Sequence, residues 1–256
     1  MRHLYKKIKN RYNWGERLLN DPVLVDAKEK SRQEIEKKPS RTDIINHIVQ
    51  FLDKEDLNYL EIGVRNPEDN FNKIIAKNKY SVDPGVEFKT NPVDFQLTSD
   101  AFFEALKRGE ILDKDKKFDV VFIDGLHLAE QVDRDIQNVL EFLEPNGFII
   151  LHDCNPPTEI HARENYYFRL SPAMDYWNGT TWKAFYKFRQ SDKVYSCCID
   201  TDWGIGVISN KINIGSPTSV KNPFFEFYVL DQNRKDSLNL MSFDFFKSIL
   251  EQSKAY

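Results

Sequence analysis

Two short clusters of ionisable residues follow two apolar runs in the middle of the chain. Asp124 and His127 come after the run 118–123, and His152 and Asp153 come after the run 148–151. Histidine has an unperturbed pKa of about 6.5, so it can exchange a proton near neutral pH. We therefore predict His127, His152 and Asp153 as catalytic residues that take a proton from an acceptor hydroxyl.

The same side chains could instead hold a divalent metal ion. Asp124, His152 and Asp153 would be its ligands, and Asn155 offers a further oxygen. Carboxylate oxygens suit Mg²⁺, whereas an imidazole suits a softer ion. The residues leave proton transfer and metal binding open as alternatives.

A strand–helix–strand unit over residues 117–157 would position these side chains. The run 118–123 does not alternate, which is typical of a parallel strand covered on both faces. Residues 145–147 (Pro-Asn-Gly) are predicted to end the following helix in a turn, and 148–151 is the second strand. The helix itself is predicted from the spacing of its apolar positions: 128, 132, 136, 139, 140 and 143. Ligands bind at the carboxyl ends of such strands.

The flanking sequence extends this unit into a doubly wound α/β sheet. Strands are predicted at 59–64 and 80–83, with a possible edge strand at 93–97. Helices are predicted after Ser40, over 70–77, from Asp100 and over 181–189. The runs 194–199 and 204–209 flank a short turn and predict an antiparallel hairpin. The fold class is thus Rossmann-like α/β, mostly parallel with a C-terminal antiparallel hairpin and helices on both faces.

Acidic residues also follow the earlier strands. Glu61 and Gly63 end the first one, and Asp83 lies at the end of the next, where an acid commonly binds ribose hydroxyls. Asp83 could equally form a turn before Pro84. Ser99 and Asp100 either cap a helix or reach toward an adenine ring. A G-x-G-x-x-G fingerprint is absent from the sequence, so a pyrophosphate site is not expected.

The segments LEIGV, YSVDPG, TSDAFF, FDVVFIDGLH and NGFIILHDCNPP together resemble the class I S-adenosylmethionine-dependent methyltransferases, and their bacterial branch most. The resemblance covers about residues 41–210 and implies a seven-stranded sheet whose last strand is antiparallel. It implies methyl transfer from S-adenosylmethionine to an oxygen of a small molecule or saccharide, with surface-glycan biosynthesis as one setting. Cofactor contacts would come from Glu61, Gly63, Asp83, Ser99, Asp100, Asp124 and Gly125.

The chain departs from the family pattern at two places. Arg65-Asn66-Pro67 stand where further glycines are usual, so Arg65 or Asn70 would replace the lost backbone contacts. Catechol-type relatives hold Mg²⁺ with an Asp and an Asp-Asn pair, and here the pair is Asp153-Cys154. Two other functions stay open: a non-catalytic binding or assembly module on a decayed methyltransferase fold, and a nucleotide-sugar or NAD enzyme.

Composition narrows the class of protein. The 256 residues carry a formal net charge of −4, without the basic surplus of a nucleic-acid-binding protein. The sequence holds no apolar run of about 18 residues and no secretory signal, so we expect a cytoplasmic protein without a membrane span. Its three cysteines form no disulfide or metal pattern. A homo-oligomer is possible.

Three segments are expected. Residues 1–40 form a helical extension packed on the main domain, 41–210 the methyltransferase domain, and 211–256 a second helical extension. Residues 156–180 contain no convincing helix or strand but are rich in Tyr, Phe and Trp. Long loops of this kind are usually functional, so residues 166–182 either form a lid over the acceptor or simply cover the sheet.

Overall fold

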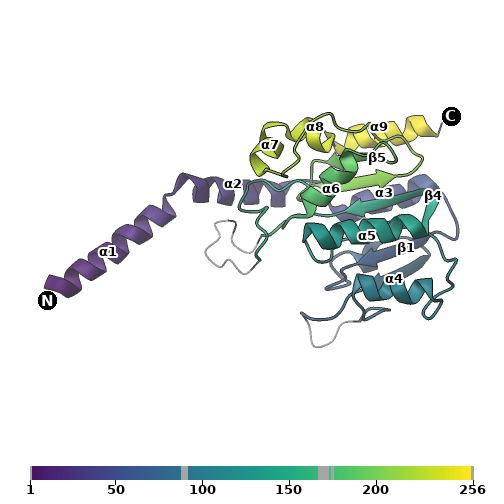
Figure 1. Ribbon diagram of the computed structural model, residues 1–256, viewed down its shortest axis with the longest axis horizontal. Coiled ribbons are helices and arrows are strands. Elements are labelled where there is room, and N and C mark those ends of the chain that lie inside the picture. Colours follow the sequence, from purple (N-terminus) through teal and green to yellow (C-terminus); the bar gives the residue numbers. More distant parts are fainter. Residues whose placement is uncertain (1, 88–91, 167–172, 174–175, 255–256) are drawn as a thin grey trace.

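A seven-stranded sheet forms the centre of the computed structural model, which describes residues 2–87, 92–166, 173 and 176–254. The strand order is β2-β1-β3-β4-β6-β5-β7, and helices cover both faces (Figure 1). The parallel strands are β1 (Asn58–Ile62), β2 (Asn78–Val82), β3 (Phe118–Ile123) and β4 (Leu143–Leu151).

The predicted hairpin is present beside these parallel strands. β6 (Ile205–Ser209) lies antiparallel between β4 and β5 (Tyr195–Ile199). A two-residue strand, β7 (Leu240–Met241), pairs in parallel with β5 and was not predicted from the sequence. The expected fold class is confirmed. The segment after residue 210 adds this strand to the sheet and is therefore not only helical.

Two apolar cores explain why the central strands do not alternate. Val121 and Ile123 of β3 face a core formed with α4 (Ser99–Lys107), α5 (Ala129–Phe142) and α6 (Thr181–Arg189). Val120 and Phe122 face the opposite core, formed with α3 (Arg41–Leu52) and α9 (Phe243–Ser253). Because both faces are covered, every residue of β3 is buried. Two short helices, α7 (Phe227–Gln232) and α8 (Arg234–Leu238), precede β7.

Three local predictions were wrong. Residues 145–147 form no turn after α5, because Leu143 already pairs with Phe118 and the extra residues make an irregularity within β4. The helix expected over 70–77 is only a 3-10 turn, η1 (Phe71–Lys73). Asparagine side chains compete with helix formation there, as when Asn66 accepts from the backbone N–H of Glu68. The stretch 93–97 makes only a single bridge, between Phe95 and Val82.

The first 40 residues form two helices, α1 (Arg2–Leu19) and α2 (Pro22–Glu36), separated at Asp21 as predicted. The second half of α2 packs on the domain through Ala27, Ser31 and Glu34. The expected packing of α1 was wrong, since none of its residues is buried and the helix projects away from the domain (Figure 1).

Candidate active site

The ends of β3 and β4 bring the two predicted clusters into contact. Ile123 pairs in register with Leu151, so the residues that follow each strand leave the sheet side by side. His152 Nδ1 lies 3.1 Å from both Asp124 Oδ1 and Asp153 Oδ2. The sheet therefore brings these predicted side chains within contact distance of one another.

His127 joins this group from the loop before α5. Its Nδ1 lies 3.0 Å from Asp153 Oδ2 and 3.1 Å from the backbone carbonyl of Trp177, and its Nε2 lies 3.3 Å from Asp124 Oδ1. The side chain of His127 is 22% exposed, whereas that of His152 is 7% exposed. His127 is thus the histidine that a bound molecule can reach more easily.

Two further residues of the cluster were missed by sequence reasoning. Asp202, in the turn between β5 and β6, lies 3.2 Å from His152 Nε2. Arg41, the first residue of α3, places its Nη1 2.5 Å from Asp124 Oδ2 and its Nε 3.1 Å from Asp202 Oδ2. Both lie at the boundary of a predicted element, a helix start and a hairpin turn. Their charge at the boundary of a predicted element was the signal that could have found them.

Opposite charges balance within this cluster. Burial opposes a charge on His127, but the carboxylates of Asp153 and Asp124 outweigh it and raise the pKa of His127 to about 10. Burial and Arg41 likewise oppose a charge on His152, yet Asp124 and Asp153 raise its pKa well above the usual range. Both histidines are therefore protonated in this arrangement, so the pKa near 6.5 that favoured them as bases does not apply to it.

The carboxylates shift in the complementary direction. Burial opposes their ionisation, but His152 and Arg41 hold the pKa of Asp124 well below its usual range. His152 and His127 lower the pKa of Asp153 in the same way. Hydrogen bonding to His152, with the charges of His152 and Arg41, lowers the pKa of Asp202. Three carboxylates thus face three cations.

The backbone at Asp153 is strained. Its φ of 62° lies in the left-handed region, which is unfavourable for a residue with a side chain. Asn178 donates a 2.7 Å hydrogen bond to Asp153 Oδ1 and leaves Oδ2 for the two histidines. Strain of this kind is concentrated at functional sites, and here it turns the carboxylate toward the cluster.

Glu61 points into the protein rather than out of the sheet edge. Its Oε2 accepts hydrogen bonds from the hydroxyl of Tyr59 (2.5 Å) and from Asn70 Nδ2 (2.8 Å). Burial raises the pKa of Glu61 to about 7, although both hydrogen bonds lower it. Asn70 is buried as well and also contacts Thr42. Glu61 and Asn70 therefore support the end of β1 from inside.

Gly63 lies where the loops after β1 and β3 meet. With its φ of 92°, a Cβ at this position would be 2.4 Å from the backbone oxygen of Asp124 and 2.5 Å from the Cα of Gly125. No other residue fits there, because the neighbouring atoms belong to the backbone. The loop after β3 thus explains this glycine without a ligand.

The remaining predicted cofactor residues lie along the same edge of the sheet. Asp83 accepts from the backbone N–H of Gly85 (2.7 Å), as in a turn, and its own N–H donates to the carbonyl of Phe95 (3.2 Å). That bond brings the segment leading to α4 to the end of β2. Arg65 is exposed and lies within ion-pair distance of Asp69 and Glu87.

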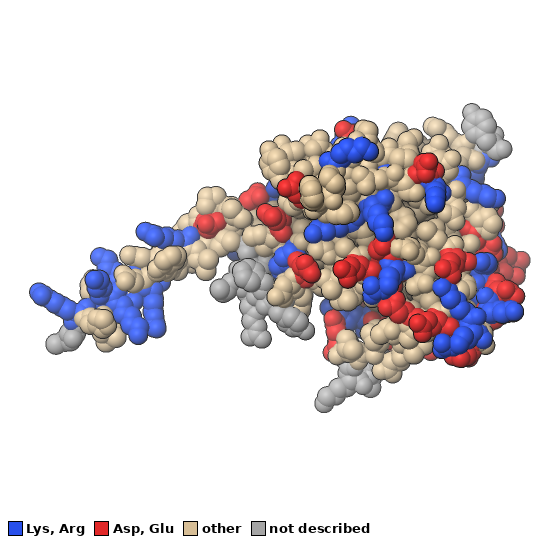
Figure 2. All heavy atoms as spheres, in the orientation of Figure 1, with Lys and Arg blue, Asp and Glu red and all other residues tan. Residues whose placement is uncertain are grey.

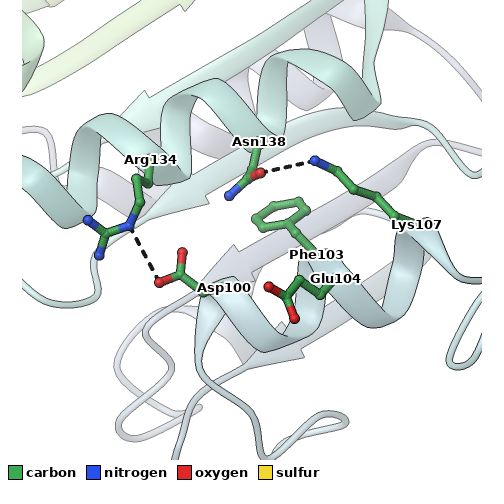
Figure 3. Close-up of a pocket in the computed structure, with 6 residues that line it drawn as sticks. All are labelled: Asp100, Phe103, Glu104, Lys107, Arg134 and Asn138. Atoms are coloured by element: carbon green, nitrogen blue, oxygen red, sulfur yellow. Dashed lines mark hydrogen bonds and ion pairs between the residues drawn. The ribbon is translucent and has the colours of Figure 1, made fainter.

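Ser99 and Asp100 begin α4, but Thr98 provides the N-cap. Gln131 donates to Ser99 Oγ (3.1 Å) and to Asp100 Oδ1 (3.2 Å). Figure 3 shows Asp100 turned toward Arg134, 3.5 Å away, across a surface hollow between α4 and α5. Asp100 is thus engaged with α5.

Trp177, in the segment rich in aromatic residues that follows β4, covers His127. The ring of Trp177 stacks on His127 with centroids 5.2 Å apart, and Tyr166 packs against Trp177. Gly179 allows this contact, since a Cβ at its φ of 60° would be 2.1 Å from the carbonyl oxygen of His127. Tyr167 and Phe168, also predicted for this loop, lie outside the described residues.

The chemistry of the donor set fits a divalent ion. One atom each from Asp124, His152 and Asp153 lies within 4.8 Å of the others. His152 Nδ1 is buried and makes no well-directed hydrogen bond, although two carboxylates surround it. A metal at this point would require His152 to lose its proton.

The two residues that follow Asp153 add no ligand to this set. Asn155 turns away from it, because its oxygen accepts from Arg234 Nη1 (2.6 Å) and its amide donates to Asp200. Cys154 is fully buried, and burial raises the pKa of its thiol well above the usual range. Cys154 is thus an apolar filler.

A known protein family matches just over half of the chain. A family model described as "Methyltransferase domain" matches residues 23–154, which is 132 of the 256 residues. No curated protein matches the chain. Within the described residues, no helix is both long and apolar enough to cross a membrane.

Similar solved structures share little sequence with this chain. An O-methyltransferase from Bacillus cereus in complex with SAH has 15% identity and a TM-score of 0.43, over 74% of this chain and 91% of that one. An SAH-bound methyltransferase from Podospora anserina has 14% identity and a TM-score of 0.41, over 79% and 96%. The MycE methyltransferase of mycinamycin biosynthesis, in complex with Mg and SAH, has 14% identity and a TM-score of 0.44, over 81% and 60%.

Proposed function

Because this chain belongs to the methyltransferase domain family, we propose that it transfers a methyl group from S-adenosylmethionine to a hydroxyl of a small molecule or saccharide. The observation that carries the proposal is the cluster at the ends of β3 and β4, where His127 and His152 contact Asp124 and Asp153. A methyltransferase acting on oxygen needs proton-handling groups beside its acceptor, and this cluster supplies them. We assign the catalytic unit to residues 41–210, preceded by α1 and α2 and followed by a segment that holds α7, α8, β7 and α9.

The cofactor belongs at the edge formed by the ends of β1, β2 and β3. Asp83 is the residue we assign to the ribose, because it lies at the end of β2 where the chain also approaches α4. We assign Ser99, Asp100 and Gly125 to the same cofactor edge, together with the exposed side chain of Arg65. Glu61 and Asn70 act indirectly, since both side chains are buried in bonds to each other and to Tyr59. S-adenosylmethionine supplies a methyl group already activated on a sulfonium cation.

The acceptor belongs on the side of His127 and Trp177. His127 is the proposed proton acceptor, because it is more exposed than His152 and lies under the aromatic ring of Trp177. Its raised pKa means that it must first lose its proton. The sulfonium cation of bound S-adenosylmethionine would favour that loss, because a nearby positive charge disfavours the protonated form of His127. Asp153 holds the ring in place through Nδ1, and Trp177 offers an apolar face to a ring-shaped acceptor.

A divalent ion is an optional part of the site. Asp124, His152 and Asp153 would hold it, and the imidazole favours an ion softer than Mg²⁺. Such an ion would stabilise a deprotonated acceptor oxygen. Arg41 already neutralises part of the carboxylate charge, so the cluster can persist without the ion.

Cofactor binding is tested by calorimetry with S-adenosylhomocysteine. We expect the wild-type protein to bind it and Asp83→Ala to lose at least about tenfold in affinity, because a charged acceptor of ribose hydroxyls is removed. Asp115→Ala, which changes an exposed loop carboxylate, is the matched control and should bind normally. Absence of heat with the wild-type protein would refute the proposal, and competition by NAD would instead favour a dinucleotide enzyme.

Proton transfer is tested with His127→Ala and Asp153→Ala. Each variant should lose about 10²- to 10⁴-fold in turnover on a responsive hydroxyl acceptor while keeping its affinity for S-adenosylhomocysteine. Release of S-adenosylhomocysteine in the presence of catechols and saccharides identifies such an acceptor. Cofactor binding with no methyl transfer to any acceptor would favour a non-catalytic binding module. Equal loss of affinity and turnover would make these residues cofactor ligands.

A further inference from the structure

Helix α1 has a continuous apolar face that nothing in the described structure covers. At about 100° per residue, Leu4, Ile8, Tyr12 and Leu19 fall on one side of the helix, with Tyr5 at its margin. All five side chains are exposed, and α1 contributes no buried residue. A face of this kind requires a partner.

The opposite side of α1 is strongly basic. Most of its cations point away from the apolar face, while Lys7 and Arg11 flank one edge of it. The cations of the helix are Arg2, Lys6, Lys7, Lys9, Arg11 and Arg17, against one acid, Glu16. In Figure 2 these blue side chains gather at the projecting end of the molecule. α1 therefore has a formal charge of +5, whereas the whole chain has −4 and the remaining residues together have −9.

We propose that α1 binds reversibly to an anionic lipid surface, lying flat on it with the apolar face among the acyl chains. The charge of the helix complements lipid phosphates, and Lys and Arg side chains can extend from a buried stem to the headgroups. Tyr and Trp rings, here Tyr5, Tyr12 and Trp14, are favoured at the level of the headgroups. At 18 residues, α1 is about 27 Å long, enough for a substantial contact.

A lipid surface fits this face better than a second copy of the chain. In a helical pair, Gly15 would leave a gap in the middle of the contact, because it offers no side chain to interlock. Lys7 and Arg11, at the edge of the apolar face, would also lie close to the equally basic helix of the second copy. Fluid acyl chains tolerate both features. The acidic remainder of the chain would be repelled by the same surface, so the projecting helix would carry the contact alone.

Co-sedimentation with vesicles tests the proposal on the full chain. Vesicles of equal parts phosphatidylcholine and phosphatidylglycerol should bind the protein, and vesicles of phosphatidylcholine alone should bind it far less. Added salt should weaken the binding, because it screens the charges. The Lys6→Gln/Lys7→Gln variant should bind about 30-fold more weakly, at about fivefold per charge. Lys193→Gln/Lys211→Gln, the same charge change at exposed positions on the domain, should bind as the wild type does.

The apolar face is tested with Leu4→Gln/Ile8→Gln, which keeps helix-forming residues and should reduce binding by at least about tenfold. Since α1 is not packed on the domain, the midpoint of thermal unfolding should stay unchanged in every α1 variant. Equal binding to both kinds of vesicle, or none to the anionic ones, would overturn the proposal. A drop in molar mass of the lipid-free protein caused by Leu4→Gln/Ile8→Gln would assign the face to a second copy instead. The test does not require methyl transfer, so it is independent of the proposed function.

Discussion

Glu61 is an acidic residue that the fold buries at the end of β1. The residue is 3% exposed, and its carboxyl group accepts hydrogen bonds from Tyr59 and Asn70. Burial raises its pKa to about 7 from an ordinary value of 4.5. For an acid, a raised pKa in the folded state means that folding favours the protonated form. The resulting stability is present below the unfolded pKa and is lost as the pH rises through about 7.

Replacing this carboxyl group with an amide should therefore change the free energy of unfolding more at high pH than at low pH. We expect Glu61→Gln to be close to neutral at about pH 5 and to stabilise the protein by up to about 3 kcal/mol, relative to wild type, at about pH 8. The amide oxygen can still accept from Tyr59 and Asn70. Chemical denaturation at both pH values measures the difference. A constant difference across this range would mean that Glu61 titrates normally.

At this scale the sequence predicted which residues meet but not their protonation. Asp124, His127, His152 and Asp153 could be grouped because each follows a recognisable strand. The pKa of a histidine depends on the carboxylates around it, and those distances follow only from the folded structure.

Helix α2 is attached to the domain through a buried histidine. Ser31 Oγ lies 2.8 Å from His161 Nε2, and Thr158 Oγ1 lies 2.8 Å from His161 Nδ1. Burial lowers the pKa of His161 to about 4, with a smaller contribution from Arg163, so the ring is neutral near pH 7. Each ring nitrogen then has one hydroxyl partner, which a neutral imidazole can satisfy.

Removing one of these partners should loosen the helix. Ser31→Ala leaves a buried ring nitrogen without a partner and should destabilise the protein by about 1–3 kcal/mol. Ser248→Ala is the matched control, because both hydroxyls donate to a carbonyl of their own helix, Ser31 to Ala27 (2.8 Å) and Ser248 to Phe245 (2.7 Å), whereas Ser248 has no hydrogen bond to a histidine among the described residues. Equilibrium unfolding in urea compares the two. An equal effect of both changes would rule out the histidine contact as the cause.

Elements with strong periodicity were predicted well, and weak or short ones were not. The strand over 118–123, the helix over 181–189 and the hairpin agree with the structure, because burial on both faces or on one stripe dictates their pattern. β7 has only two residues and no pattern of its own. α1 has a clear helical pattern, but a pattern does not say what its apolar face contacts.

Contacts at the site join two segments that lie far apart in the sequence, residues 37–41 and residues 200–202. The backbone N–H and the guanidinium of Arg41 bind Asp202, which is 161 residues away. Thr201 Oγ1 donates to the carbonyl of Pro39 (2.7 Å), and Lys37 Nζ lies 2.7 Å from Asp200. The segment before α3 is therefore attached to the turn between β5 and β6.

The ion pair of Arg41 and Asp202 should contribute more to the free energy of unfolding than an ordinary surface ion pair does. Arg41→Met should cost about 3–5 kcal/mol, because it removes one of the cations that face the partly buried carboxylates of Asp124 and Asp202. Combining it with Asp202→Asn should recover more than about 1 kcal/mol relative to additivity in a double-mutant cycle. Lys77→Met breaks the exposed pair with Asp56 (2.7 Å) and should cost less than about 1 kcal/mol. Additive effects of the Arg41 and Asp202 changes would exclude their coupling.

Long-range contacts of this kind are what the sequence could not supply. Local spacing predicts a strand, a helix or a turn, whereas the choice of Asp202 as partner for Arg41 follows from how the sheet brings the hairpin beside α3. The parallel strands and the hairpin were predictable because their patterns are local in the sequence, whereas this contact joins residues that are 161 positions apart.

The attachment of residues 37–41 to the hairpin turn has a consequence for synthesis on the ribosome. Strands β1 to β4 and the residues that follow them emerge before Asp202 does, so the nascent chain holds Arg41 and both histidine–aspartate clusters well before their last partner arrives. At roughly 5–20 residues per second, the wait between residues 154 and 202 lasts several seconds. Any product that ends before the hairpin contains most of the cluster but leaves Asp202 out of it, and a ribosome-bound chain would acquire the complete charge balance only after the hairpin has emerged.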